Sequence, residues 1–285
     1  MTATSARARP RLAAPLALGL ALAAPLAACG ETGGRAEPAA TSTAPATTAP
    51  ATSATTSGGS GRVLVFSKTT GFRHQSIPDG IGALRDIGAQ LSLEVDATED
   101  ASRIADASLA RYQAVVFLST TGDLLDDDQK AALQRYVRAG HGWLGIHAAA
   151  DAEYRWAWYA GLVGAQFRRH PAVQQATVVV DPIGRTLVGP VPQRWQRTDE
   201  WYDFRTNPRG KVRVLATVDE TTYTGGGMGA DHPIAWCHDY EGGRSWYTGM
   251  GHTNESFKEP LFLAHLAAGV RYVTGQSGAG CAASG

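Results

Sequence analysis

The residues best suited to chemistry in this sequence are histidines that follow predicted strands. Residues 142–146 form a short apolar run that ends at His147, and the small residues Ala148 and Ala149 come next. A buried strand that runs into a turn of small residues is typical of a nucleophile elbow, which raises one side chain above the carboxyl edge of a sheet. An imidazole there can act as a general base, a general acid or a metal ligand, but does not form a stable acyl-enzyme. The alternative is a tight turn whose histidine bonds only backbone. We favour a functional His147, because open α/β sheets bind ligands at this edge.

Four further candidates lie in similar positions. Arg73 and His74 follow the first predicted strand, so they are expected at the same edge, where they would bind a substrate oxygen. His74 capping the next helix is the alternative. Asp151, four residues after His147, either orients that imidazole or caps a helix. His252 follows a strand that ends in glycines, which let the backbone approach a ligand closely, so it is the second catalytic candidate.

A carboxylate and two aromatic residues stand together at Glu200, Trp201 and Tyr202. Such residues suit sugar binding, because carboxylates accept hydrogen bonds from hydroxyls and ring faces stack on C–H surfaces. An ordinary strand end is the alternative. His170 is a weaker candidate, since a histidine before proline is often only part of a turn.

No two histidines have the short spacing of a zinc motif, so the sequence identifies no metal site locally. The sequence also contains no evident cofactor motif. A divalent metal remains an open alternative, because four dispersed residues could converge in space: His74, His147, Glu200 and His252.

The elements that would position these residues alternate between strand and helix. Apolar runs predict strands at 62–66, 91–95, 114–118 and 142–146. Helices are predicted after residue 76, from about residue 126 to residue 139, and over 259–274. This alternation predicts a doubly wound, mostly parallel sheet. Residues 174–247 are richer in strand-like runs and contain a predicted hairpin at 240–246.

The start of the chain predicts export. Three arginines precede an Ala/Leu-rich run over 12–28 that ends in Leu26-Ala27-Ala28-Cys29, which resembles a bacterial lipobox. We therefore expect residues 1–28 to be a signal peptide and Cys29 to be the lipidated N-terminus, anchored to the cell membrane with the domain outside the cytoplasm. An uncleaved membrane helix is disfavoured, because the run is short and contains two prolines. Signal cleavage with release of a soluble protein is the other alternative.

The rest of the chain divides into a tether, a domain and a tail. Residues 29–61 are rich in Thr, Ala, Pro and Ser, and without large apolar side chains they are predicted to be a disordered linker. Residues 62–275 form the folded domain, and 276–285 a flexible tail. Three cysteines are too few for a disulfide framework. Cys237 is predicted to be a buried thiol in a strand and Cys281 to lie in the loose tail.

The balance of basic and acidic residues limits which kinds of binding partner are expected. The chain has 26 basic and 26 acidic residues, which gives no basic footprint for nucleic acid. The expected partners are a carbohydrate and, through the lipid anchor, a membrane. The sequence does not define an oligomeric state.

Five motifs recur in the order seen in the ThuA-like (trehalose utilisation) family, which the chain resembles over nearly all of its folded domain. They are residues 72–74, 145–151, 167–171, 199–202 and 247–255. The resemblance implies a flavodoxin or class I glutamine amidotransferase-like α/β sandwich with a mostly parallel central sheet and added β-hairpins. It also implies work on a carbohydrate, either a keto-sugar or a glycoside.

Two functional hypotheses follow. In the first, the chain is an enzyme in which His147 and His252 move protons next to a sugar carbonyl and Glu200 binds or polarises the substrate. Its substrate-binding residues would be Arg73, His74, Asp151, His170, Trp201 and Tyr202. In the second, the chain is a non-catalytic carbohydrate-binding or scaffolding lipoprotein. Glutamine amidotransferase activity is not expected, because the elbow carries no cysteine.

Overall fold

The computed structural model describes residues 61–182 and 184–281. The predicted signal peptide, the lipidation site at Cys29 and the linker up to residue 60 lie outside the described residues. The first described strand begins at Gly61.

Eleven strands are described, and nine of them form one mixed sheet. They are β1 (Gly61–Phe66), β2 (Leu93–Thr98), β3 (Ala114–Leu118), β4 (Gly142–Ile146), β5 (Phe167–Arg169), β6 (Gln174–Val180), β7 (Arg194–Asp199), β8 (Asp203–Phe204), β9 (Arg213–Asp219), β10 (Pro233–Tyr240) and β11 (Gly243–Thr248). The sheet order is β2-β1-β3-β4-β11-β10-β9-β6-β7, and β5 pairs with β8 separately. Strands β2, β1, β3, β4 and β11 pair in parallel, whereas the pairs from β11 to β7 are antiparallel.

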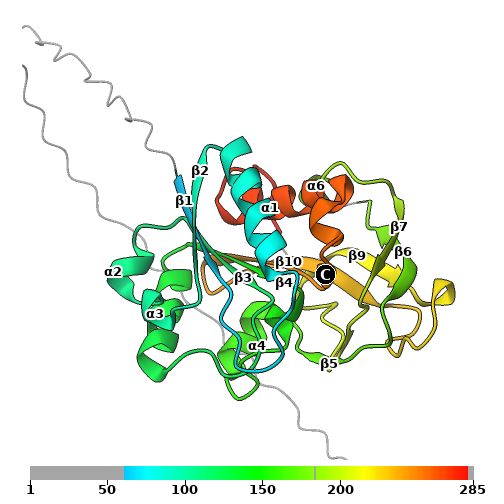
Figure 1. Ribbon diagram of the computed structural model, residues 1–285, viewed down its shortest axis with the longest axis horizontal. Coiled ribbons are helices and arrows are strands. Elements are labelled where there is room, and N and C mark those ends of the chain that lie inside the picture. Colours follow the sequence, from blue (N-terminus) through cyan, green and yellow to red (C-terminus); the bar gives the residue numbers. More distant parts are fainter. Residues whose placement is uncertain (1–60, 183, 282–285) are drawn as a thin grey trace, which may run out of the picture. The chain divides into compact units, whose positions relative to one another are not determined.

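Helices cover both faces of this sheet. The α-helices are α1 (Ile77–Gln90), α2 (Asp106–Leu109), α3 (Asp127–Arg138), α4 (Ala157–Val163), α5 (Arg185–Val188) and α6 (Pro260–Val273). Four short 3-10 helices, η1 (Ala101–Arg103), η2 (His147–Ala150), η3 (Glu220–Thr222) and η4 (Ser256–Lys258), lie in the connections. Figure 1 shows α1 and α6 on one side of the sheet, and α3 and α4 on the other. The predicted α/β class is confirmed.

Local sequence explains the parallel half of the sheet. Every residue of β3 and β4 is buried, as expected for strands covered by helices on both faces. Helix α3 begins with a capping box, in which the Asp126 carboxylate accepts from the Gln129 backbone N–H and the Gln129 side chain accepts from the Asp126 N–H. The predicted turn at 240–246 joins β10 to β11 through Glu241 and Gly242, which both have positive φ. Positive φ at both central residues is characteristic of two-residue hairpin turns.

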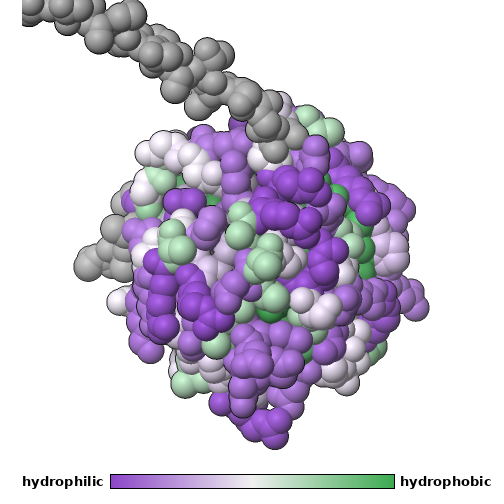
Figure 2. All heavy atoms as spheres, turned by 90° about the vertical axis from the view of Figure 1, so that its left-hand side faces the viewer, coloured by the Kyte–Doolittle hydropathy of each residue, from purple (hydrophilic) through white to green (hydrophobic). Residues whose placement is uncertain are grey.

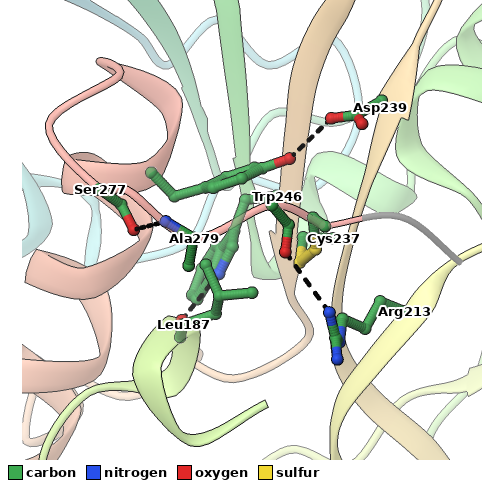
Figure 3. Close-up of a disulfide and its surroundings, with 10 residues drawn as sticks. Leu187, Arg213, Cys237, Asp239, Trp246, Ser277 and Ala279 are labelled. Atoms are coloured by element: carbon green, nitrogen blue, oxygen red, sulfur yellow. Dashed lines mark hydrogen bonds between the residues drawn. A yellow bond between two sulfur atoms is a disulfide. The ribbon is translucent and has the colours of Figure 1, made fainter. Parts of the chain in front are cut away.

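The C-terminal segment corrects the predictions for Cys237, Cys281 and the tail. Cys237 in β10 and Cys281 form a disulfide, with a Cα–Cα distance of 5.8 Å, and both residues are fully buried. Figure 3 shows the segment after α6 returning to β10 beside Trp246. The Arg213 guanidinium donates to the Gly280 carbonyl at the same place. Up to Cys281, therefore, the segment is fastened to the domain by a covalent bond and by side-chain hydrogen bonds.

No helix in the described part of the chain is long and apolar enough to span a membrane. The face drawn in Figure 2 is mostly hydrophilic, and its hydrophobic residues are scattered in small groups.

Candidate functional site

Four candidate residues meet at one edge of the sheet. His74 follows β1, His147 follows β4, Glu200 follows β7 and His252 lies shortly after β11. The pairing directions place the carboxyl ends of all four strands at the same edge. Each of the four offers one ligand atom, and these atoms all lie within 4.8 Å of one another. The sequence prediction that these residues could converge is therefore met by the geometry.

His147 occupies the elbow that the sequence predicted. Its φ is +51°, an unusual conformation for a residue with a Cβ, which turns the chain sharply as β4 ends. The Nδ1 atom lies 2.8 Å from the carbonyl oxygen of Gly249, which only accepts hydrogen bonds, so Nδ1 carries a proton. The Tyr247 hydroxyl donates to the His147 carbonyl, and the Tyr202 ring packs at 4.3 Å between centroids. The Nε2 atom is thereby aimed at the other three residues.

The Nε2 atom of His147 is the centre of the cluster. It lies 3.1 Å from His74 Nε2 and 3.3 Å from His252 Nδ1. The Glu200 Oε2 atom lies 3.5 Å from His147 Nε2 and 3.2 Å from His252 Nδ1. Three ring nitrogens and one carboxylate oxygen therefore face a common point.

A buried ion pair, which the sequence did not predict, positions the His252 loop. Asp199 at the end of β7 accepts from the backbone N–H groups of Gly251 and His252, at 2.8 and 3.0 Å. The Arg197 guanidinium lies 3.2 Å from Asp199 and donates to Ser256. The sequence signal was available, because alternation along β7 places Arg197 and Asp199 on the buried face. Charged residues are almost never fully buried unless they are paired.

The cluster shifts the protonation of its members. Burial, with the neighbouring His147 and His252, lowers the pKa of His74 to about 3. Burial acts to raise the pKa of Glu200, but hydrogen bonds with His147 and His252 outweigh it and hold that pKa below its usual range. Burial acts to lower the pKa of His252, and its hydrogen bond to Glu200 outweighs that effect and raises the pKa. These shifts favour the neutral form of His74 and the charged forms of His252 and Glu200.

Four of the six distances between the ligand atoms of the cluster match those of a metal coordination sphere. Zinc bonds to imidazole nitrogen and carboxylate oxygen are about 2.0–2.1 Å long, which in a tetrahedral site separates the ligand atoms by about 3.3 Å. The four distances given above span 3.1 to 3.5 Å. The bond from His147 Nδ1 to Gly249 is also the kind of outer hydrogen bond that fixes a metal-binding imidazole.

A small cavity of about 190 Å³ opens onto the cluster. Its lining includes His74, Glu200 and His252 together with Asp151, His170 and Tyr202. Burial raises the pKa of Asp151, whose carboxylate accepts from the Tyr154 hydroxyl at 2.6 Å. His170 Nδ1 lies 3.0 Å from Glu200 Oε1. Besides His74, three of the predicted substrate-binding residues therefore line the same cavity.

Two of the roles considered for Asp151, and the role considered for Trp201, are not met by the geometry. Asp151 neither orients His147, which bonds Gly249, nor caps α4, which begins after Trp156. Trp201 is fully buried and its indole N–H donates to the Gln174 carbonyl, so no ring face is open to a sugar.

Arg73 is exposed beside the cluster but already has a partner. Its guanidinium donates two hydrogen bonds to the Glu99 carboxylate, at 3.0 and 2.7 Å. The charge of Arg73 is therefore balanced before any ligand arrives.

A second group of potential metal ligands is occupied by protein partners. His232 places Nδ1 2.8 Å from Glu220 and Nε2 2.8 Å from the Tyr202 carbonyl. Asp203 pairs with Arg169 and accepts from the Gly227 N–H. These bonds fasten the glycine-rich segment before β10 to the sheet, so we interpret the group as structural.

Solved structures with this fold are known. A ThuA-like protein from Bacteroides uniformis has a TM-score of 0.65 and 21% identity, over 77% of this chain and 94% of that one. A ThuA-like protein from Parabacteroides merdae has a TM-score of 0.62 and 19% identity, over 75% and 90%. A cytoplasmic protein from Salmonella typhimurium has a TM-score of 0.52 and 16% identity, over 75% and 98%. At these identities the likeness shows the fold alone. The comparison with curated proteins gave no significant match.

Fold and site together define an α/β protein with a histidine–carboxylate cluster at the carboxyl edge of its sheet. The family model ThuA, described as trehalose utilisation, matches residues 62–273, and the chain belongs to that family. Membership gives the chain a sugar-related role in general.

Proposed function

We propose that this chain is an exported, membrane-tethered ThuA-like protein that converts a keto-sugar or glycoside at the His74–His147–Glu200–His252 cluster. The observation that carries the proposal is the convergence of three imidazole nitrogens and one carboxylate oxygen on one point, next to a cavity. A protein that only binds sugar has no need of such a cluster, since hydroxyls are held well by separate polar groups and ring faces.

A divalent metal ion, zinc or a similar first-row ion, is the occupant that suits the cluster. Imidazole nitrogen and carboxylate oxygen are its common protein ligands, and the ligand atoms have the spacing of such a site. Without an ion, the three ring nitrogens face one another, and His147 Nε2 has no proton to donate because the proton of that ring is on Nδ1. The adjoining cavity leaves room for a further ligand from water or substrate.

The chemistry would be shared between the ion and Asp151. A bound ion would act as a Lewis acid on a sugar carbonyl or hydroxyl oxygen and would so acidify the neighbouring C–H or O–H. Asp151 lines the same cavity, and burial raises its pKa. A carboxyl group of raised pKa is suited to take up that proton and return it. Tyr202 and His170 would hold the sugar against the cluster.

Two features support export. The first is the lipobox-like ending at Cys29, described above. The second is the Cys237–Cys281 disulfide, since disulfides persist in oxidising compartments and are rare in the cytosol. We therefore place the domain outside the cytoplasm, held to the membrane by a lipid on Cys29.

Metal content and sugar turnover test the proposal. Purified protein should bind one equivalent of Zn²⁺ in calorimetric titrations, and His252→Ala and Glu200→Gln should each weaken binding at least about tenfold. His141→Ala is the matched control, because His141 stacks on Tyr136 away from the cluster and should leave affinity unchanged. Zinc affinity equal in the wild type and His252→Ala would contradict the metal site.

The same preparations separate an enzyme from a binding protein. Metal-loaded protein should consume a keto-sugar or glycoside from a substrate panel, and chelation should abolish the reaction. Sugar binding without any conversion would favour the non-catalytic carbohydrate-binding alternative.

A further inference from the structure

A second, larger hollow adjoins the cluster. It has a volume of about 470 Å³ and shares Phe72, His74 and His252 with the small cavity. Its remaining walls come from the loop after β1, from Val173 and from residues 253–255. The two hollows therefore adjoin each other, and two residues of the cluster, His74 and His252, line both. A site for a single sugar ring would not need the larger hollow.

Apolar side chains are exposed at the larger hollow. Among the described residues, Phe72 and Val173 are the large hydrophobic side chains that stay exposed, 64% and 42%, and both line it. One edge of Phe72 is held by the His74 ring, at 4.8 Å between centroids and nearly perpendicular. Exposed apolar surface that is gathered at a hollow usually marks a binding site.

Polar groups without protein partners share the same hollow. The described contacts include no hydrogen bond or ion pair to the side chains of Gln75 and Glu255, and both residues are exposed. Asn254 donates its amide N–H to Asp79, which leaves its side-chain carbonyl oxygen available. A phenyl ring opposite amide and carboxylate oxygens matches a sugar ring, whose C–H face is apolar and whose rim carries hydroxyl donors.

We propose that this hollow, lined by Phe72, Gln75, Val173, Asn254 and Glu255, is a second subsite that binds the second unit of a two-ring glycoside. One ring occupies the small cavity against the cluster, and the neighbouring ring stacks on Phe72 and donates hydroxyl protons to Gln75, Asn254 and Glu255. The inference rests on the proposed carbohydrate function and adds the substrate size.

The charges in the subsite specify a neutral second ring. Glu255 is the one side chain of the lining with an unbalanced charge, since the Arg73 guanidinium is paired with Glu99. A phosphate or carboxylate on the second ring would face the Glu255 carboxylate without a cation to compensate. Like charges at close range disfavour binding. The subsite should therefore reject phosphorylated sugars and uronic acids.

Calorimetry with matched ligands tests the subsite. The probes are trehalose and methyl α-glucoside, each unoxidised and with one hydroxyl oxidised to a ketone, together with trehalose 6-phosphate. The wild type should bind the better two-ring probe at least about tenfold more tightly than the matching one-ring probe. A difference of that size is what one stacked ring and its hydrogen bonds would contribute. Gln75 lines only the larger hollow. Gln75→Ala should therefore lower the affinity for the two-ring probe and leave the affinity for the one-ring probe unchanged.

Phe72 provides the stacking test. Phe72→Ala should reduce the two-ring preference about tenfold, whereas Phe72→Tyr keeps a ring face and should restore it. Glu255→Lys should raise the affinity for trehalose 6-phosphate relative to trehalose. A wild type with no two-ring preference, or a preference unaffected by Phe72→Ala and Gln75→Ala, would overturn the subsite while leaving the proposed function intact. Failure of metal-loaded wild type to bind any of these sugars would overturn both.

Discussion

The disulfide between Cys237 and Cys281 is expected to contribute a large part of the domain's stability. The two cysteines are 44 residues apart. In the chain-entropy account, closing a loop of that length in the unfolded chain stabilises the fold by about 4 kcal/mol. Because single domains are stable by only about 5–15 kcal/mol, reduction should remove a substantial fraction of the total. The bond also holds the segment after α6 against β10, so its loss should free that segment (Figure 3).

Denaturant unfolding with and without reductant measures this effect. The free energy of unfolding should fall by about 2–4 kcal/mol on reduction. Cys281→Ser should give the same loss without reductant, because the serine sits in the terminal segment and leaves the packing of β10 in place. Thiol titration of the denatured, unreduced protein should detect neither Cys237 nor Cys281. A midpoint that is unchanged by reduction, together with two titratable thiols from this pair, would refute the reasoning.

Three further predictions concern the site, the anchor and the pH dependence of stability. His252→Ala should reduce sugar turnover at least about 10²-fold. It should change the unfolding free energy by no more than about 1 kcal/mol, because the His252 side chain is partly exposed. A large stability loss with turnover intact would point to a structural role. Cys29→Ala should abolish labelling by a palmitate analogue, and equal label in both proteins would exclude lipidation at Cys29. His265 is fully buried between Val188 and Thr248, and burial lowers its pKa to about 3. The unfolded chain takes up a proton below pH 6.5 while the folded state does not, so stability should fall by about 2 kcal/mol from pH 6.5 to pH 5. His265→Gln should lose that part of the slope in urea unfolding, and an identical slope in both proteins would contradict this assignment.

Much of the site could be predicted because its residues follow strands. Apolar runs identify β1, β3 and β4 directly, and the carboxyl ends of parallel strands share an edge, so His74 and His147 were expected to meet. His252 was found in the same way, from the glycines after β11. Gly251 has a φ of +115° and packs closely against Ile146 and Phe262, which explains the glycine at that position.

Other features depend on contacts that no local pattern encodes. The pairing of Cys237 with Cys281 requires the chain after α6 to cross back to β10, and a Gly/Ser/Ala composition gives no sign of that path. Trp201 was expected at the ligand and lies in the core; every residue from Asp199 to Phe204 is buried, so the sequence does not tell which side chains face the cavity. The four possible metal ligands could be named from the sequence, but they are spread over nearly 180 positions, so the distances between them come only from the folded chain.

The late position of β11 in the chain has a consequence for assembly. Strand β4 lies between β3 and β11, yet β11 is made about one hundred residues after β4. Until residues 243–252 are available, β4 is an edge strand whose backbone groups and fully apolar side chains lack their partner. Such an edge favours pairing with other chains, and contacts of long sequence separation form slowly. A chain shortened before β11 should therefore aggregate instead of forming a smaller domain, and only the complete chain would bring His147 and His252 together.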